Sequence, residues 1–448
     1  TLLFFWELMA ISSTFLVWAK KDETAKKAGI RYFLVHFFGG NLLLAGIFIK
    51  VSQGEYLINS LSQNMDIASI FILIGISINA AIYPLHAWLP DAYPKSTISG
   101  SVFMSCLTTK VAVYCLVRVF PGVPILIWGG VVMCLLGVLY AMFANDLRVI
   151  LSYHIISQVG YMVAAVGLGS ELALNGAVAH AFSHILYKSL LFMGAGTILY
   201  ATGFSKLTDL GGLFKKIPGV VVLYFIGSLA ISGFPYLNGF TSKAVILSAA
   251  SVTKYPEVEL LLYLASVGTL ISTCLKVTYY SFLGEAKKSY DIKKVPINMY
   301  ISMIITAVLC FVYGSFPNLL YNRLPFEMNY IPYTFDHVIS TVQILLASTL
   351  AFLFFVEIME PKEYFLLDTD WLYRKPLVFV TRKTSEVVVT IQENLGAVWG
   401  TGILSIVPFF NNPFRKLNVI NSENETPEKY DPDHYRFSIG LAVTIAIM

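Results

Sequence analysis

The sequence predicts an all-α membrane protein that crosses the bilayer many times. Its 448 residues are 56% hydrophobic and only 13% charged, with a mean hydropathy of +0.70, whereas soluble chains carry roughly a quarter charged residues. Its apolar runs are about 20 residues long, as a membrane helix requires, and longer than the roughly ten-residue alternating strands of a membrane barrel. These observations exclude both a soluble enzyme and a barrel.

Eleven segments approach or reach spanning length, and a twelfth crossing is expected to begin near His434. In chain order the eleven are 1–18, 30–49, 67–94, 99–120, 123–144, 150–168, 174–202, 217–251, 258–283, 297–316 and 338–358. Thr1 opens directly into an apolar run and Met448 ends in another. We therefore expect the chain to be part of a longer polypeptide.

Loop charges support this count and orient the crossings. Alternating crossings place most basic residues on one side, which the positive-inside rule identifies as the cytoplasmic side. The residues expected there are Lys20, Lys21, Lys26, Lys27, Lys95, Arg148, Lys206, Lys215, Lys216, Lys287, Lys288, Lys293 and Lys294, against Lys50, Arg118, Lys254 and Arg323 on the other side.

Segments 67–94 and 217–251 are too long for one plain helix and carry helix breakers at mid-depth. Interrupted backbone is tolerated in a membrane only where protein or a watery cavity satisfies the freed groups. The two segments lie five crossings apart and therefore enter from opposite faces, which predicts an inverted repeat with discontinuous helices at its centre. The predicted breakers are Pro84 and Pro90 in the first segment, and Gly233, Pro235 and Gly239 in the second.

Ionisable residues inside the apolar segments are the candidate functional residues, because a charge within the bilayer is costly to keep. Such a series of acid, lysine and histidine groups suits stepwise proton transfer. The candidates are Glu7, Lys110, Lys243 and the group His180, His184 and Lys188, whose spacing of four places it on one helix face, with Lys276, His36 and His154 as weaker members.

Structural roles remain open for several of these residues. Glu7 could be a buried acid paired with a lysine, and the histidines could be hydrogen-bonded packing residues. Lys276 could extend toward Lys287 and Lys288 at the membrane surface. His86 and Asp91 are expected to tie the first broken helix.

We expect neither a cofactor nor a metal in this chain. Its sequence lacks a Walker loop, a GxGxxG after a strand, a GxSxG, and haem or cluster motifs. The five cysteines have no metal-ligand spacing, and no carboxylate or cysteine completes a set beside His180 and His184. Ion movement must then be driven by a gradient or by partner subunits.

Four motifs, in this order and spacing, carry a family resemblance: YPLHAWLPDAYP, NDLRVILSYHIISQVGYM, HAFSHILYKSLLFMGAG and SGFPYLNGFTSKAVIL. Over residues 1 to about 320 the sequence resembles the antiporter-like subunits shared by respiratory complex I, Mrp-type sodium/proton antiporters and membrane-bound hydrogenases, most closely the D-type Mrp subunit. The resemblance implies about fourteen helices built from two inverted five-helix repeats. About four N-terminal helices are then missing from this chain.

The resemblance implies a domain organisation. Residues 1–120 form the first inverted repeat without its first helix, 121–285 the second repeat, 286–358 additional transmembrane helices, 359–432 an interfacial helix and polar loop, and 433–448 the start of a further transmembrane helix.

It also implies residue roles. Glu7, Lys110, the group on 180–188 and Lys243 match the family's polar axis across the membrane, with Lys243 facing the exit side. One departure stands out: the family usually has a lysine five residues before the proline of PLH, and this sequence has Asn79 there. Glu7 then lacks its usual partner. Either it pairs elsewhere, for example with Lys110, or the first half-channel works differently or not at all.

Several functions follow. The first is a proton-translocating subunit that a redox partner module drives, as in an NADH:quinone oxidoreductase-like or hydrogenase-like complex. The second is a subunit of a gradient-driven Mrp-type sodium/proton antiporter, although no acidic cage for sodium is visible. The third is a scaffold with an impaired first half-channel, and the fourth a free-standing solute carrier, which the resemblance disfavours.

The expected partners are other antiporter-like and small membrane subunits, peripheral redox subunits and the lipid bilayer, with no nucleic acid. The expected location is a prokaryotic cytoplasmic membrane.

Overall fold

The computed structural model describes residues 1–411 except 58–59, 63–64, 254, 286–287, 290 and 364–366. The chain divides into two compact units, residues 1–372 and 373–448. Across the described ranges the elements are helices, and the pairing of Asp146 with Lys206 is an isolated bridge rather than a strand. The predicted all-α class is confirmed.

Eight helices of the described part are long and apolar enough to cross a membrane. Three shorter apolar helices accompany them: α1 (Leu2–Trp18), α3 (Ile67–Asn79) and α10 (Pro218–Ser232). The eight spans are α2 (Glu23–Ser52), α5 (Ile98–Val119), α6 (Pro124–Phe143), α7 (Leu147–Leu168), α8 (Glu171–Thr202), α12 (Pro256–Thr269) with its continuation to Leu283, α13 (Ile297–Ser315) and α15 (Phe335–Phe354).

The first predicted break separates α3 from the short helix α4 (Trp88–Ala92). Pro84 lies in the intervening residues 80–87, as predicted. Pro90 does not break a helix, because it lies in the first turn of α4, where an N–H has no helical partner to lose. The indole of Trp88 donates to the carbonyl of Ile78 at 2.9 Å and so satisfies an oxygen freed at the end of α3.

The second predicted break separates α10 from α11 (Asn238–Ser251). Gly233 ends α10 with a φ of +83°, a conformation that favours glycine, and Pro235 lies between the two half-helices. Gly239 lies in the first turn of α11, where a Cβ would overlap the carbonyl oxygen of Ala230. The breakers therefore let the two half-helices approach closely.

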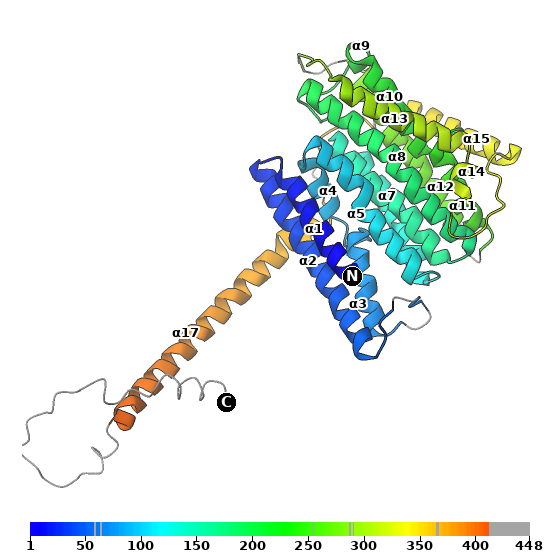
Figure 1. The fold of residues 1–448 in the computed structure, drawn as a ribbon. Helices are drawn as coiled ribbons and strands as arrows, with labels where there is room; N and C mark the ends of the chain where they lie inside the picture. Colours follow the sequence, from blue (N-terminus) through cyan, green and yellow to red (C-terminus); the bar gives the residue numbers. More distant parts are fainter. Residues whose placement is uncertain are drawn as a thin grey trace, which may run out of the picture. The chain divides into compact units, whose positions relative to one another are not determined.

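Helix α8 is the centre of the first unit and packs against α5, α7, α10, α11 and α13 (Figure 1). Its neighbour α7 is the most buried of the spans and packs most extensively against α6. Small residues allow this approach: a Cβ on Gly130 of α6 would lie 2.5 Å from the carbonyl oxygen of Gly160 on α7. Polar side chains on α7 and α8 are thus placed deep inside the protein.

Helix α12 widens as it continues along the chain. Its last turns become the π-helical segments η2 (Leu270–Leu275) and η3 (Thr278–Leu283), and Lys276 lies between them. Such wider turns are often associated with functional positions in helices.

A connecting segment after α15, residues 356–363 and 367–369, returns to the first break. Tyr280 donates to the carbonyl of Val356 near one end of the segment. At the other end, Tyr140 donates to the carbonyl of Leu367 at 3.2 Å, and Thr369 to the carbonyl of Pro84 at 3.1 Å. The segment therefore joins the end of η3 to the first break.

Two helices follow, α16 (Asp370–Arg374) and α17 (Pro376–Asn411). Helix α17 lies within residues 359–432, where an interfacial helix and a polar loop are expected. Residues 412–448, with the polar loop and the crossing expected near His434, lie outside the described residues. Whether α17 lies at a membrane interface stays a prediction.

Candidate functional site

Six predicted basic residues lie in the interior of the first unit. They come from four places in the fold: Lys110 from α5, the group His180, His184 and Lys188 from α8, Lys243 from α11, and Lys276 from between η2 and η3. Lys110 is the most exposed of the six at 8%. Because charges are expensive in such surroundings, each group needs polar contacts of its own.

The three residues of α8 form the middle of the site. His180 hydrogen-bonds to the hydroxyl of Ser242 through Nδ1 at 3.0 Å and to the hydroxyl of Tyr187 through Nε2 at 3.3 Å. Lys188 donates to the carbonyl of Leu151 on α7 at 2.9 Å. Both ring nitrogens of His184 are buried without a hydrogen-bond partner. Since buried polar atoms are normally paired, His184 has capacity to bind water here.

Lys110 approaches this group from α5. Its ammonium donates to the carbonyl of Ser105 at 2.5 Å and to the hydroxyl of Thr109 at 3.1 Å. Its charge acts on both His184 and Lys188, as the charge of Lys188 acts on His184. The structure therefore brings Lys110 together with the residues of α8.

Lys243 approaches from the second break. Its ammonium donates to the carbonyl of Ile231 at 2.7 Å and to the hydroxyl of Ser266 at 3.2 Å, and it lies 5.1 Å from the centre of the Tyr161 ring. The carbonyl of Ile231 is at the C-terminal, partly negative end of the half-helix α10. The broken helix thus supplies the oxygen that holds the cation.

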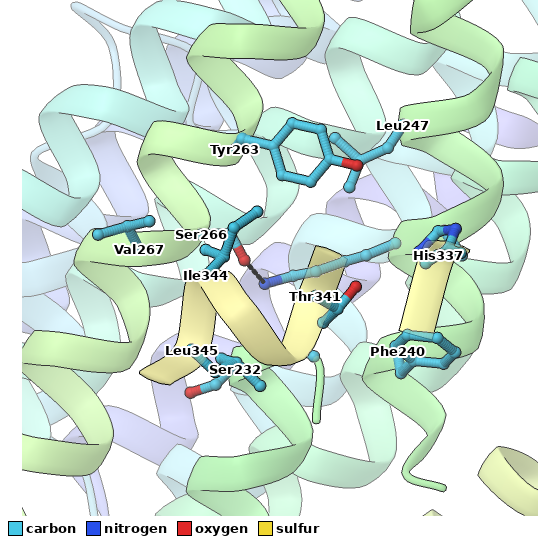
Figure 2. A pocket seen from close by; sticks show the side chains of 13 residues that line it. Ser232, Phe240, Leu247, Tyr263, Ser266, Val267, His337, Thr341, Ile344 and Leu345 are labelled. Atoms are coloured by element: carbon cyan, nitrogen blue, oxygen red, sulfur yellow. Dashed lines mark hydrogen bonds between the residues drawn. The ribbon is translucent and has the colours of Figure 1, made fainter. Parts of the chain in front are cut away.

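A small cavity of about 30 Å³ lies beside Lys243 between α10, α11, α12 and α15. Figure 2 shows its polar lining, Ser232, Tyr263, Ser266, His337 and Thr341, and the dashed line marks the bond from the lysine to Ser266. A buried water needs about 10–15 Å³ of such space, so the cavity has room for one or two waters beside the ammonium.

Lys276 does not extend toward the surface, contrary to one expectation. Only 1% of it is exposed. It donates to the carbonyls of Met142 at 2.5 Å and Ala144 at 2.9 Å, at the C-terminal end of α6. The ring of His154 on α7 hydrogen-bonds to the hydroxyl of Ser272, four residues before Lys276, at 2.8 Å.

Glu7 and Asn79 lie apart from these residues. A carboxylate oxygen of Glu7 packs directly against Gly40 of α2. Among the described residues Glu7 forms no ion pair, so its suggested pairing with Lys110 is wrong. Asn79 is fully buried at the end of α3, and neither its amide nitrogen nor its oxygen has a partner. The first break thus presents a buried amide without a partner, whereas a lysine lies beside the second break.

We call Lys110, His184, Lys188, His180 and Lys243 the buried row. The buried carboxylates of the described residues are Asp91 and Asp368, and neither lies in the row. Within the same ranges, no group of three histidines, cysteines or carboxylates could hold a metal ion. Apart from His184, the bases of the row contact carbonyl and hydroxyl oxygens.

The two buried carboxylates tie the first break in place, as expected for His86 and Asp91. Asp91 pairs with Arg31 at 2.7 Å and with Lys95 at 2.5 Å. Asp368 of the connecting segment pairs with His86 at 3.1 Å. Burial by itself would raise the pKa of Asp368, but the hydrogen bonds and charge from His86 and the bond from Tyr153 hold that pKa below its usual value.

Arg148 was expected in a loop, but the structure places it inside. Only 2% of it is exposed. Its guanidinium donates to the carbonyls of Tyr93, Ser96 and Thr97 at 2.9–3.1 Å and to the hydroxyl of Ser101 at 2.7 Å. The sequence does carry a signal for this buried position. Arg148 directly follows Leu147 and so lies in the first turn of an apolar helix rather than in the loop before it.

Most of this site lies in the part of the chain that matches a known protein family. Residues 1–272 match the family described as NADH:quinone oxidoreductase/Mrp antiporter, transmembrane. The match contains the whole buried row, whereas Lys276 and α15 lie beyond it.

Curated relatives come from several kinds of complex. An uncharacterised protein of Methanocaldococcus jannaschii is 31% identical over 71% of this chain and 71% of its own length. Hydrogenase-4 component B of Escherichia coli is 31% identical over 68% of this chain and 51% of its own length. The D-type subunit of a Na(+)/H(+) antiporter of Alkalihalophilus pseudofirmus is 30% identical over 64% of this chain and 62% of its own length. The chain thus spans about half to 71% of these relatives.

Solved structures share the fold. A chain of the Mrp complex from Dietzia has a TM-score of 0.65 at 25% identity, covering 71% of each chain. A chain of the archaeal membrane-bound sulfane sulfur reductase has a TM-score of 0.69 at 22% identity, covering 90% of this chain and 79% of that one. Respiratory complex I of Thermus thermophilus gives 0.58 at 21% identity, covering 67% and 69%.

Proposed function

Because the chain belongs to the family of membrane subunits shared by NADH:quinone oxidoreductases and Mrp antiporters, we propose that it carries protons along the buried row within a multisubunit membrane complex. It is a multi-pass membrane protein with an antiporter-like role in an Mrp, complex I or hydrogenase type of assembly.

The observation that carries the proposal is that buried bases from three helices meet and are held by neutral oxygens. Lys188 and Lys243 each have a carbonyl as their nearest ligand, at 2.9 Å and 2.7 Å. A buried carboxylate partner would fix the ammonium form, whereas a neutral ligand and desolvation bring the free energies of the charged and neutral forms closer together. Such a group can release and regain a proton.

The route we propose runs from Lys110 to Lys188, then along α8 through His184 to His180, and then to Lys243. His180 is joined to α11 by its bond to Ser242, the residue next to Lys243. Waters at the unpaired nitrogens of His184 complete the connection between Lys188 and His180. Lys276 and His154 form a side branch, with Lys276 in a mainly structural role at the end of α6.

The same ligands favour protons over sodium as the ion carried. Sodium, like other hard cations, is bound by several oxygen ligands at once. The carbonyls in the row already accept hydrogen bonds from ammonium groups, and the buried carboxylates Asp91 and Asp368 are paired elsewhere. We propose that a redox partner module drives this proton movement. The alternative is a gradient-driven Mrp assembly, which the sequence identity to the D-type antiporter subunit favours.

We further propose that the two broken helices are centres of two inverted five-helix repeats, the first without its initial helix, in a subunit of a prokaryotic cytoplasmic membrane. The archaeal and bacterial sources of the relatives support this location. Proteins that co-purify with the chain distinguish the driving forces: redox subunits favour the first, and an Mrp-like set without them favours the second.

The direct test measures proton uptake by vesicles that contain the purified complex. Lys243→Ala is expected to abolish uptake while the complex still assembles. Lys288→Ala is the matched control, because this lysine is 52% exposed and pairs with Asp209. Unchanged uptake in the Lys243 variant, with normal assembly, would contradict the proposed route.

A further inference from the structure

Helix α15 closes the outer side of the cavity beside Lys243. It contributes His337, Thr341, Ile344 and Leu345 to the lining. The helix lies outside residues 1–272, so the family match assigns nothing to it. Its two polar lining residues, His337 and Thr341, are one helical turn apart and face the same space as Lys243 (Figure 2).

Aromatic contacts fix α15 at the level of the second break. Tyr333, just before the helix, stacks on Tyr236 at 5.6 Å and on Phe240 at 5.2 Å between ring centres. The ring of His337 meets the ring of Phe240 edge to face at 5.1 Å. Phe240 precedes Lys243 by three residues on α11 and so lies on the same helix face. The ring of His337 is therefore held beside the cavity that Lys243 also lines.

His337 is only partly buried, unlike the histidines of the buried row. The first turn of α15 also carries Asp336, which is exposed, and its cap Thr334 is exposed as well. An imidazole at this position touches the cavity on one side and the exposed first turn on the other. Histidine is the side chain best suited to exchange protons near neutral pH.

We propose that His337 is the proton-transfer group between Lys243 and the outside of the protein, through water in the cavity. An N–H bond of the Lys243 ammonium breaks and its proton passes to a cavity water. That water gives up a proton to a ring nitrogen of His337, which becomes positively charged while Lys243 becomes neutral. The imidazolium then releases its proton outside. No electrons are exchanged, and transport in the other direction reverses each step.

The inference rests on the proposed function and deepens it, since it assigns a residue on α15 to the exit of the same route. It predicts that His337→Ala lowers proton uptake about 100-fold, the lower end of what a positioned proton-transfer group contributes. Gln343→Ala is the matched control, because Gln343 is an exposed polar residue of the same helix and does not line the cavity.

Chemical rescue separates proton transfer from a structural role. Added imidazole fits the space left in His337→Ala and is expected to restore uptake, whereas thiazole, of similar shape but much weaker basicity, is not. His337→Gln should be slow and insensitive to imidazole, because glutamine fills the space; this variant also serves if the alanine variant fails to assemble.

Two outcomes are distinguishable. If His337→Ala and His337→Gln keep the full rate while Lys243→Ala loses it, the role of His337 is refuted and the proposed function stands. If Lys243→Ala also keeps the full rate, the proposed function itself is wrong. Equal rescue by imidazole and thiazole would likewise overturn the transfer role.

Discussion

Replacing Lys188 with methionine tests the buried row at its centre. The change removes the ammonium while leaving the side-chain volume similar, and such volume-conserving swaps usually cost less than about 1.5 kcal/mol. Lys188 is fully buried, and its ammonium donates to the carbonyl of Leu151 at 2.9 Å. Losing that charge-assisted bond costs about 1.5–3 kcal/mol, and removing a buried charge returns an energy of the same order. The protein should therefore fold and assemble.

Transport should respond very differently from stability. A positioned group that gives and takes a proton contributes about 10²- to 10⁴-fold to a rate. Methionine cannot carry a proton, so we expect uptake to fall by that factor. On the proposed route Lys188 receives the proton from Lys110 before His184 does, so its loss interrupts the row.

The assay is proton uptake by vesicles containing the purified complex, followed with a pH-sensitive dye and normalised to assembled complex on a native gel. Lys288→Met is the control, since the same chemical change is made at an exposed lysine. If Lys188→Met assembles normally and transports at the rate of the unchanged protein, Lys188 is not on the route and the row as drawn is wrong.

Four further outcomes are expected. Lys276→Met loses two bonds to carbonyls at the end of α6, against one for Lys188→Met, so after the return from removing the buried charge it should still lower the free energy of unfolding by about 1.5–3 kcal/mol while slowing uptake less than Lys188→Met does. Arg148→Met leaves three carbonyls without this donor, at about 1–3 kcal/mol for each that stays buried and unsatisfied, and the loss should be visible as a lower melting temperature. Asn79→Lys places a cation among unpartnered buried atoms and is expected to raise uptake; an unchanged rate would show that the first break is off the main route. The pKa of Asp368 is lower in the folded than in the unfolded protein, so its contribution to stability is present above about pH 4 and is lost as the pH falls through the folded pKa. Protection of the connecting segment from protease should fall over the same pH range. Asp368→Asn should abolish this pH dependence.

The sequence was sufficient for features that depend on neighbouring residues. Proline and glycine act on their own backbone, so Pro84, Gly233 and Pro235 located both breaks. Pro90 was misassigned, because whether a proline breaks a helix depends on where the helix begins, and α4 begins only two residues earlier. The burial of Lys110 and Lys243 followed from the apolar residues around them.

Features that depend on contacts between distant helices could not be predicted from the sequence. Arg148 finds its acceptors about fifty residues away, in and just after the first break, and Lys276 bonds carbonyls more than a hundred residues earlier. Both contacts are set by how helices lie against each other, which no local pattern specifies. The suggested pairing of Glu7 with Lys110 failed for the same reason: opposite charges in one sequence do not establish that their helices bring them together.

The lack of acids in the buried row limits how many charges it can hold at once. His180, His184 and Lys188 follow one another by a single helical turn, about 5.4 Å. Two adjacent protonated groups at that spacing repel by roughly 3 kcal/mol at an effective dielectric constant near 20. Without a negative charge to offset it, a second proton enters only as the first moves on. On the proposed route protons would therefore move in single file, and the departure of a proton at Lys243 would admit the next one at Lys110.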